Sequence, residues 1–512
     1  MALLSELLDG AGVTDDKAVW DNIADIGVNS IRDDSFRVTP GDVFVAVRGT
    51  KYDGHDFICV AVGRGAKVVV CERATGFLEN HPEVCYVLVE NTRLALAVMW
   101  NNLCGKPSDR MMFAAVTGTN GKTSTAYFLR QIFREAGYRT GLIGTVRCFI
   151  GDESFNIDSP DFSDVNGMTT PAPETLYPLL RRMADAGVEI VFLEASSHSL
   201  DQRRLDPIRF IVSVFTNLTE DHLDYHGTME NYFEAKKRLI DLSEVAVVNL
   251  DDGWFETLCE SPVIPTVCFS PVGDERADFS ARNQRCDLAS GGIAYDVCET
   301  GKLYRITCPV SGDFTIANTL GAVSAARLFG IKPEIIRRAL ESCPQIPGRM
   351  EKIRTDRDFE VYIDYAHTPD ALGRAIKTLL PRRRGGGRLT VLFGCGGDRE
   401  KQKRPEMGRI ASTLADRVII TGDNSRTENP RAIICDILRG IEDRTYCRVI
   451  ERRRDAIRYA ISTAGPGDVI LLAGKGHEDY ETDKTGKHRF VEREEITDAL
   501  RLWREDNDDN TV

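Results

Sequence analysis

The sequence lacks the short cysteine spacings that mark zinc sites and disulfide frameworks. Its 14 cysteines are scattered over 512 residues, and no C-x-x-C pair occurs among them. Cysteines without such spacings are expected to be reduced thiols, mostly buried in the hydrophobic core. We therefore predict neither a zinc centre nor a disulfide framework.

Long apolar runs and an excess of positive charge are also missing. No segment approaches the ~18 apolar residues of a membrane span, and residues 1–9 carry acidic side chains where a signal peptide needs a basic end. The formal net charge of -13 argues against nucleic acid as a bulk electrostatic partner. We expect a cytoplasmic monomer with no membrane span and no nucleic-acid partner.

Length and composition predict several globular domains. The hydrophobic fraction of 42% and the charged fraction of 28% are typical of soluble proteins. At roughly 150 residues per domain, the chain has room for about three. Helical patterns are interrupted at 106–108 and a new segment begins near 347. We predict domains at 1–106, 107–346 and 347–512, all of α/β class, with a mostly parallel sheet in the central domain.

Residues 117–124, Thr-Gly-Thr-Asn-Gly-Lys-Thr-Ser, follow an apolar run and precede a helical pattern. A glycine-rich loop between a strand and a helix is typical of a phosphate cradle, in which backbone N–H groups turn toward the phosphates. Lys122 would neutralise phosphate charge, and the Thr123 hydroxyl would reach Mg²⁺. Val116 stands where the strict pattern has another glycine, so the loop is a shorter variant. The loop predicts that ATP or GTP binds.

Two polar segments follow the next predicted strands of the central domain. Glu194 comes directly after the apolar run 188–193, and His222 and His226 follow the run 210–215. Ligands of parallel sheets gather at the carboxyl ends of the strands, so Glu194 and a histidine are expected beside Thr123, around a divalent cation. Spacing does not separate His222 from His226. The alternative is a capping glutamate and a histidine that only forms hydrogen bonds.

Further polar sets suggest two more ligands. Hydroxyl groups and arginines at 169–170, 196 and 202–204 suit an anionic, hydroxyl-rich substrate, although a hydrated loop would have a similar composition. In the third domain, four consecutive predicted strands end in glycine and charged residues. Arg399, Arg426 and Glu478 lie at these ends and would complement the carboxylates and ammonium group of an amino acid. A surface salt-bridge set is the alternative.

Taken together, these motifs resemble those of the Mur ligase family, ATP-dependent amide-forming enzymes of peptidoglycan synthesis. The resemblance covers nearly the whole chain and is strongest to the members that add diaminopimelate. It implies a UDP-binding N-terminal domain, a central P-loop ATPase domain, and a Rossmann-like C-terminal domain that binds the incoming amino acid. The matching segments are, in order, 118–123, 194–198, 221–227, 235–236, 364–369 and 474–478, with 39–46 and 53–55 in the N-terminal domain.

The reaction implied by the resemblance is the ATP-dependent addition of meso-diaminopimelate to UDP-N-acetylmuramoyl-L-alanyl-D-glutamate. In the family, ATP phosphorylates the substrate carboxylate, and the amine then attacks the acyl phosphate. Mg²⁺ is implied, as is a carbamate formed from CO₂ on a lysine that follows an alanine, here Lys236. The implied catalytic residues are Lys122, Glu194, His222 and Lys236. The implied metal ligands are Thr123, Glu194, His222 and Lys236 as the carbamate.

The resemblance also assigns three sets of binding residues. ATP would be bound by Gly118, Thr119, Asn120, Gly121, Lys122, Thr123, Ser124, Asn318, Arg349, Asp364 and His367. The UDP-substrate would be bound by Ser35, Thr50, Thr169, Thr170, Ser196, Gln202 and Arg204. The amino acid would be bound by Arg399, Asp423, Asn424, Ser425, Arg426, Gly474 and Glu478.

The chain departs from the family pattern at three positions. Phe36 replaces an arginine of the N-terminal motif, Met168 replaces an asparagine, and Ser425 replaces the proline of the diaminopimelate signature Asp-Asn-Pro-Arg. Arg426, which would pair with the distal carboxylate of diaminopimelate, is retained, so we favour diaminopimelate over L-lysine. The alternatives are the L-lysine-adding enzyme, a sibling such as folylpolyglutamate synthetase or the dipeptide-adding enzyme, and a nucleotide-dependent switch without amide chemistry.

Overall fold

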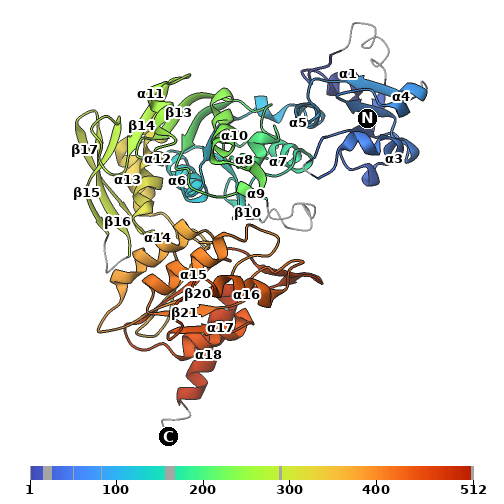
Figure 1. Cartoon of the computed structure of the whole chain (residues 1–512). Helices are drawn as coiled ribbons and strands as arrows, with labels where there is room; N and C mark the ends of the chain where they lie inside the picture. The colour runs from blue at the N-terminus through green and yellow to red at the C-terminus, as the bar shows by residue number, and fades with distance from the viewer. Residues whose placement is uncertain are drawn as a thin grey trace.

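The computed structural model describes residues 2–14, 26–49, 51–81, 84–155, 168–286 and 291–508. Figure 1 shows three lobes that follow the chain: an N-terminal lobe in blue, a central lobe in green and yellow, and a C-terminal lobe in orange and red. The principal sheets of the lobes have four, eleven and six strands, respectively. The predicted α/β class is confirmed.

The N-terminal lobe is built on a parallel sheet with the strand order β3-β4-β5-β6. Val43 and Val45 pack into one part of its core and Phe44 into the other, because side chains alternate along a strand. The strands and helices of this lobe are β1 (Ala2–Leu3), α1 (Leu4–Leu7), β2 (Gly27–Val28), β3 (Ile31–Arg32), η1 (Ser35–Arg37), β4 (Val43–Val45), η2 (Gly54–Phe57), α3 (Ile58–Gly63), β5 (Val68–Cys71), α4 (Gly76–Asn80), β6 (Cys85–Leu88) and α5 (Thr92–Leu103).

The central lobe places β7 (Met112–Thr117) in the middle of its sheet, whose order is β10-β9-β8-β11-β7-β12-β13-β14-β15-β16-β17. Pairing is parallel from β8 to β15, so the carboxyl ends of these strands meet at one edge, as predicted. Antiparallel strands extend both ends of the sheet, which was not predicted. The other strands are β8 (Thr140–Ile143), β9 (Cys148–Ile150), β10 (Glu153–Phe155), β11 (Ile190–Glu194), β12 (Phe210–Phe215), β13 (Ser243–Asn249), β14 (Thr266–Ser270), β15 (Phe279–Cys286), β16 (Ile293–Glu299) and β17 (Lys302–Cys308).

Both faces of the central sheet are covered by helices. Ala114 and Val116 of β7 enter one buried cluster, and Phe113 and Ala115 enter the cluster on the opposite face. One face is covered by α6 (Lys122–Glu135), α12 (Phe314–Leu328) and α13 (Pro333–Glu341). The helices of the opposite cluster are α7 (Pro173–Asp185), α8 (Ser197–Asp201), α10 (Met229–Asp241) and α11 (Glu256–Glu260), and α9 (Leu223–His226) precedes α10.

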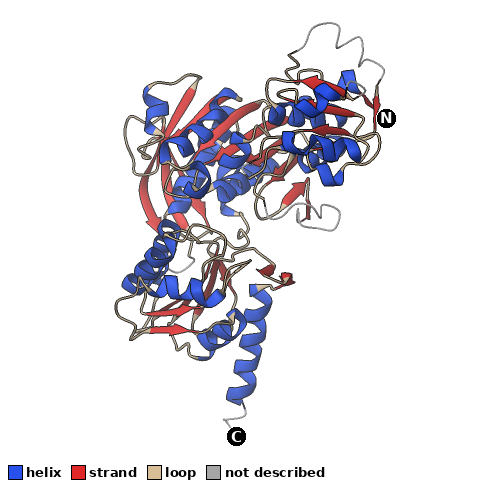
Figure 2. Ribbon diagram, turned by 45° about the vertical axis from the view of Figure 1, so that its right-hand side comes forward, coloured by secondary structure: helices blue, strands red, loops and turns tan. Residues whose placement is uncertain are grey.

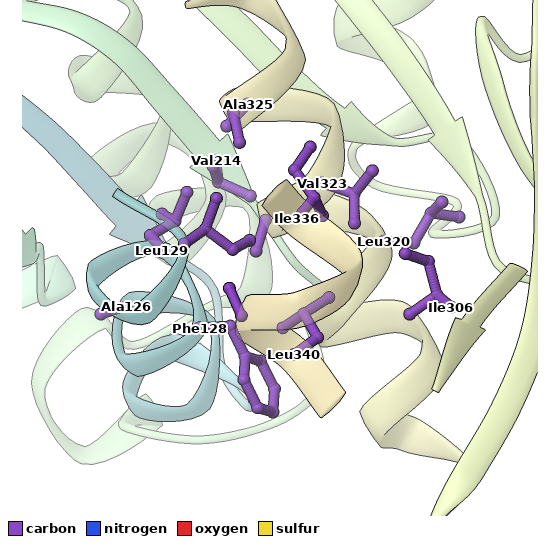
Figure 3. Close-up of a cluster of buried hydrophobic side chains, with 14 of the residues drawn as sticks. Ala126, Phe128, Leu129, Val214, Ile306, Leu320, Val323, Ala325, Ile336 and Leu340 are labelled. Atoms are coloured by element: carbon purple, nitrogen blue, oxygen red, sulfur yellow. The ribbon is translucent and has the colours of Figure 1, made fainter. Parts of the chain in front are cut away.

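The helix that follows the phosphate loop is fixed by this core. Figure 3 shows Phe128 and Leu129 of α6 turned toward Ile336 and Leu340 of α13, and all four side chains are fully buried. Burying each such side chain contributes about 1.5–3 kcal/mol. The start of α6 is therefore held rigidly beside α12.

The C-terminal lobe has the sheet order β18-β19-β23-β20-β21-β22, parallel except for β18. We predicted that the four strands with polar ends are consecutive in the chain. They are β19, β20, β21 and β23, and the edge strand β22 lies between the last two. The elements are β18 (Glu351–Ile353), β19 (Glu360–Asp364), α14 (Pro369–Leu379), η5 (Leu380–Arg382), β20 (Leu389–Phe393), α15 (Lys403–Leu414), β21 (Arg417–Ile420), α16 (Pro430–Leu438), β22 (Cys447–Val449), α17 (Arg453–Ser462), β23 (Val469–Ala473), β24 (Tyr480–Asp483), β25 (Gly486–Arg489) and α18 (Glu492–Asp508).

Figure 2 shows the last helix, α18, extending beyond the sheet of its lobe toward the C-terminus. Its first part packs with α17 through buried Ile496 and Ala499. Among the helices of the described residues, none combines the length and the apolar character that crossing a membrane requires.

The cysteine prediction was wrong at one pair. Cys259 at the end of α11 and Cys268 in β14 form a disulfide, because the turn between these elements brings two residues nine positions apart face to face. Of the free cysteines in the described chain, Cys71, Cys104, Cys148, Cys308, Cys343 and Cys395 are buried, and the other six are partly or fully exposed.

Candidate active site

A cavity of about 410 Å³ is lined by residues of the central and C-terminal lobes together. The central lobe contributes the phosphate loop and the carboxyl ends of β8, β11 and β12. The C-terminal lobe contributes the segments that follow β19, β20, β21 and β23. The strand ends predicted from the sequence therefore meet at one cavity.

The phosphate loop adopts backbone conformations that require its glycines. Gly118 has φ of 142° and Gly121 has φ of 88°. A Cβ atom at Gly118 would overlap the hydroxyl of Thr216, and one at Gly121 would overlap the side-chain amide of Asn318. The side chain of Asn318, from α12, thus lies directly against Gly121. Any larger residue at position 121 would collide with it.

Hydrogen bonds from the neighbouring strand end hold the loop open. The backbone N–H of Asn120 donates to Asn217 Oδ1 at 3.0 Å, and the Thr216 hydroxyl donates to the Asn120 carbonyl at 2.6 Å. Lys122 Nζ donates to the carbonyls of Gly118 and Thr119 at 2.8 and 2.9 Å, and burial lowers its pKa. The loop and its lysine are arranged as a cradle that a phosphate would fit.

Glu194 ends β11 and is fully buried. Its carboxylate accepts hydrogen bonds at 2.9 Å from the Thr123 hydroxyl and from the N–H and hydroxyl of Thr145. No cationic side chain of the described residues lies within 4.0 Å of it. A buried carboxylate that lies beside a hydroxyl oxygen and forms no ion pair with a described side chain fits a hard divalent cation such as Mg²⁺.

The protein side chains do not complete a metal site by themselves. Across the described ranges, no group of three or more His, Cys, Asp or Glu side chains is arranged to hold a metal ion. A cation beside Glu194 would therefore need further oxygen ligands, which phosphates, water or a carbamate could supply.

His222 and His226, which spacing in the sequence did not distinguish as metal ligands, occupy different positions. His222 lines the cavity, and its Nε2 lies 3.5 Å from Asp221. Burial lowers the pKa of His222 to about 3 against the opposing effect of Asp221, so its imidazole is neutral and able to bind a metal. His226 does not line the cavity; it is buried, and its Nε2 lies 2.9 Å from the Ser197 hydroxyl.

Lys236 is buried beneath the phosphate loop rather than in the wall of the cavity. Its side chain is almost completely buried, its Nζ lies 2.8 Å from the carbonyl of Gly118, and the same atom lies 4.5 Å from the Tyr232 ring centroid. Burial, followed by the positive charge of Lys122, lowers the pKa of Lys236 well below its ordinary value. The lowered pKa favours the neutral, nucleophilic form of the Lys236 amine.

The hydroxyl and arginine set from the central lobe is brought together around the end of β11. Thr170 Oγ1 donates to the Glu194 carbonyl at 2.7 Å, and Arg204 donates to the Thr170 carbonyl at 2.7 Å. Gln202 accepts hydrogen bonds from Arg204 at 2.6 and 3.1 Å. Burial lowers the pKa of Arg204 to about 10, which leaves it protonated at neutral pH. The set offers hydroxyl groups and a cation at one wall of the cavity.

Hydrogen bonds connect several members of the amino-acid set in the C-terminal lobe. Asn424 Nδ2 donates to Glu478 Oε2 at 2.7 Å, and Arg426 NH1 donates to the Gly397 carbonyl at 2.6 Å. Arg426 has φ of 51°, a conformation that few non-glycine residues adopt. Burial and the nearby Asp423 carboxylate raise the pKa of Glu478 to about 7. Guanidinium and carboxylate groups thus line the cavity from the ends of β21 and β23, on either side of β20.

Two contacts join the C-terminal lobe directly to the phosphate loop. Arg349 donates to the Thr123 hydroxyl at 3.1 Å, and Asn120 Nδ2 donates to Asp370 at 3.3 Å. Asp364 is used inside its own lobe, since it accepts hydrogen bonds from the backbone of Met350 and Ala366 at 2.7 and 2.9 Å.

The predicted residues divide into those that line the cavity and those that do not. The lining residues are Thr119, Asn120, Gly121, Lys122, Thr123, Thr169, Thr170, Glu194, Ser196, Arg204, His222, Arg349, His367, Arg399, Asp423, Asn424, Arg426, Gly474 and Glu478. The residues placed outside the lining are Gly118, Ser124, Lys236, Asn318, Asp364, Gln202, Ser425 and Ser35, the last of which is in the N-terminal lobe. Thr50 lies outside the described residues.

Several cavity residues were not predicted. Thr145 follows β8, and Glu400 and Lys403 follow Arg399 after β20. The same rule that selected Glu194 would have found Thr145, had β8 been recognised as a neighbour of β11 in the sheet. Asp221 and Tyr365 also line the cavity, each beside a residue that was predicted.

Comparison with known proteins agrees with this architecture. The family profile of the Mur ligase middle domain matches residues 116–326, that of the Mur ligase family catalytic domain matches 28–100, and that of the Mur ligase glutamate ligase domain matches 348–476. A relative from Clostridium botulinum, a UDP-N-acetylmuramoyl-L-alanyl-D-glutamate--2,6-diaminopimelate ligase, is 38% identical over 93% of this chain and 95% of its own. The chain belongs to the Mur ligase family. It is accordingly an ATP-dependent ligase, as predicted.

Other members of the Mur ligase family extend the comparison. A ligase of the same name from Chlorobaculum tepidum is 39% identical over 96% of each chain. A solved structure bearing that name superposes with a TM-score of 0.65 at 30% identity, covering 97% of this chain and 98% of the other. The MurF ligase of Thermotoga maritima in complex with ADP, at 21% identity, covers 94% of this chain and 99% of its own with a TM-score of 0.58, and shows the shared fold.

Proposed function

We propose that this Mur ligase adds meso-diaminopimelate to UDP-N-acetylmuramoyl-L-alanyl-D-glutamate in peptidoglycan precursor synthesis. The observation that carries the proposal is one cavity lined jointly by a phosphate loop, a hydroxyl and arginine set, and an arginine and carboxylate set. These are the complements of a triphosphate, a UDP-sugar peptide and a diamino dicarboxylic acid. We also propose that it acts as a cytoplasmic monomer with domains at 1–106, 107–346 and 347–512.

The reaction would proceed in two steps. A carboxylate oxygen of the UDP-dipeptide bonds to the γ-phosphorus of ATP while the bond to the bridging oxygen breaks and ADP leaves. An amine nitrogen of diaminopimelate then bonds to the acyl carbon, phosphate departs, and the amine gives up a proton. Both steps gather negative charge on phosphoryl oxygens, next to Lys122 and Arg349.

Thr123, Glu194 and His222 would hold Mg²⁺. When bound, the cation supplies charge stabilisation for the phosphoryl oxygens. The fit rests on Glu194, whose buried carboxylate has hydroxyl and amide partners but no ion pair within 4.0 Å among the described side chains. His222 adds a neutral imidazole from the segment that follows β12, on the other side of β7.

Lys236 would carry a carbamate. Its neutral amine would attack CO₂, forming an N–C bond and releasing a proton, which turns a buried amine into a carboxylate. Burial and the adjacent Lys122 favour this change, because they disfavour a second ammonium group at the same place. The carbamate would reach past Gly118 toward the phosphates and the cation.

Selectivity for diaminopimelate over L-lysine would depend on Arg426. Its guanidinium group lines the cavity opposite Glu478, and L-lysine has no distal carboxylate to pair with it. Ser425 is not among the residues that line the cavity and Arg426 is, which supports a role for the arginine despite the replacement of the family's proline. An L-lysine-adding enzyme is the second candidate, because Ser425 departs from the diaminopimelate signature.

The test is a panel of amino acids with the UDP-dipeptide, ATP and Mg²⁺, with phosphate release as the readout. We expect turnover with meso-diaminopimelate and at least 10-fold slower turnover with L-lysine, since one charged hydrogen bond is worth about 1.5–3 kcal/mol. Equal turnover with L-lysine would remove the substrate assignment. Turnover without any UDP-sugar would move the protein to a sibling activity such as folylpolyglutamate synthesis.

A further inference from the structure

Lys475 is a fully buried cation directly behind the amino-acid set. It follows Gly474 at the end of β23, and it does not line the cavity. Its Nζ donates to Asn424 Oδ1 at 3.0 Å and to the Tyr480 carbonyl at 2.7 Å. The same atom lies 3.6 Å from Glu478 Oε2 and 3.8 Å from Asp423 Oδ1. One ammonium group thus contacts three residues whose side chains face the cavity.

The contact with Asn424 decides which way that amide points. Asn424 Oδ1 accepts from Lys475 and also from the backbone N–H of Thr482 at 2.9 Å, and both of these groups are donors only. The oxygen must therefore face Lys475, and the amide nitrogen must face the cavity side. There Asn424 Nδ2 donates to Glu478 Oε2 at 2.7 Å. Lys475 thereby orients the Asn424 amide, which in turn positions the Glu478 carboxylate.

The contact of Lys475 with the Tyr480 carbonyl also helps to position Arg426. Lys475 holds the start of the hairpin β24–β25, in which Tyr480 pairs with Arg489 and Thr482 pairs with Lys487. The Thr482 carbonyl accepts the backbone N–H of Arg426 at 3.0 Å. Arg426 is held in its left-handed conformation by this bond and by the bond of its guanidinium group to Gly397.

Charge gives Lys475 a second role. The side chains of Asp423 and Glu478 are only 9% and 14% exposed, and the Asp423 carboxylate raises the cost of ionising Glu478. For both carboxyls burial acts to raise the pKa, and Lys475 is the nearest positive charge that acts to lower it. Arg426 has the same effect on both, and Glu481 and Arg453 add charges around the group. Without the ammonium group, the pKa of Glu478, which is already raised to about 7, would rise further.

We propose that Lys475 is a positioning residue that sets selectivity for the amino acid by orienting Asn424, Glu478 and Arg426 and by favouring the ionised form of the carboxylates that would face the substrate's ammonium group. This inference rests on the proposed function, since it needs the amino-acid set to bind diaminopimelate. It goes beyond that function by assigning a role to a residue that contacts no substrate.

The experiment compares wild type with Lys475→Met, which keeps the length of the side chain and removes its charge and donors. We expect KM for diaminopimelate to rise roughly 10- to 10²-fold, because a buried network loses its central donor. KM for ATP and for the UDP-dipeptide should change less than about two-fold. The control is Lys484→Met, which removes an exposed lysine from the tip of the same hairpin and should leave all three constants unchanged.

The pH dependence separates positioning from general destabilisation. With the ammonium group removed, the acid limb of kcat/KM for diaminopimelate should move to higher pH by about one unit or more, a shift that a merely loosened fold would not produce. An unchanged KM and an unchanged acid limb would overturn the inference. If Lys475→Met does not fold, Lys475→Arg decides: it keeps the charge but not the bond geometry, so a raised KM with an unmoved acid limb supports the inference and an unchanged KM overturns it.

Failure of this inference is distinguishable from failure of the proposed function. If wild type does not use diaminopimelate at all, the function is wrong. If wild type uses it and Lys475→Met binds it equally well, only the role of Lys475 is wrong.

Discussion

Lys236 Nζ lies 2.8 Å from the carbonyl oxygen of Gly118, although 118 residues separate them in the chain. The contact brings the middle of α10 against the first glycine of the phosphate loop. The buried amine also lies 4.5 Å from the Tyr232 ring centroid, and burial and Lys122 oppose its protonation more strongly than Asp221 favours it. The position couples the state of Lys236 to the loop that would hold ATP.

Substituting Lys236 by alanine should abolish ligase turnover, with a loss of at least 10²-fold, because the site loses the anion that would help to hold the cation. ATP should still bind, since the phosphate loop is kept. Phosphate release with both substrates measures the first effect, and equilibrium ATP binding measures the second. Lys237→Ala is the control, because Lys237 is more exposed and pairs with Glu234 at 3.2 Å, away from the phosphate loop. Loss of turnover in both variants to the same extent would contradict the assignment to Lys236.

Substituting Arg426 by alanine should weaken diaminopimelate and leave L-lysine almost unaffected. The expected rise in KM for diaminopimelate is roughly 10- to 10²-fold, from the loss of one charged pair of about 1.5–3 kcal/mol. Steady-state kinetics with both amino acids would check it. Arg431→Ala is the matched control, since Arg431 is largely exposed and pairs with Glu451 outside the cavity. An equal loss for both amino acids would mean that Arg426 acts on the fold and not on the distal carboxylate.

Gly121→Ala should reduce ATP affinity sharply, whereas Gly137→Ala should reduce stability alone. Both glycines have positive φ, 88° and 96°, so either alanine costs of the order of 1–3 kcal/mol in backbone strain. Only at Gly121 would the new Cβ overlap Asn318, and nothing lies within 4 Å at Gly137. Thermal unfolding and ATP titration, performed on both variants, separate the two effects. Equal loss of ATP affinity in the two would show that strain, and not the crowding of the loop, is responsible.

Glu478→Gln should stabilise the protein at alkaline pH and not at acidic pH. Burial and Asp423 raise the pKa of Glu478 to about 7 from an ordinary value of 4.5. The folded state therefore holds a proton that the unfolded state has released, so the stability from this group is complete below pH 4.5 and is lost as pH rises through 7. The neutral glutamine does not ionise, so its advantage in Tm should be greater at pH 8 than at pH 5. A constant difference in Tm across this range would contradict the raised pKa.

Much of the architecture was predictable because local patterns report it. The run 210–215 becomes β12 without a change of boundary, and the run 111–116 becomes β7 with a shift of one residue. The strands β15 to β17 were missed, because none of them contains an apolar run as long as those that predicted β7 and β12. The disulfide between Cys259 and Cys268 was missed because a spacing of nine residues identifies no pairing until the turn is known.

The sequence by itself determined the family, the α/β class, and the strand ends at which polar residues gather. Motif residues such as Gly118, Lys122 and Glu194 adjoin their strands, and adjacency in the chain is enough to place them. Only the tertiary structure decided that His222 faces the cavity while His226 is buried, and that Lys236 and Lys475 are buried outside its lining. Such choices depend on side-chain direction and on contacts between segments more than 50 residues apart, such as Lys475 with Asn424, which local sequence patterns do not encode.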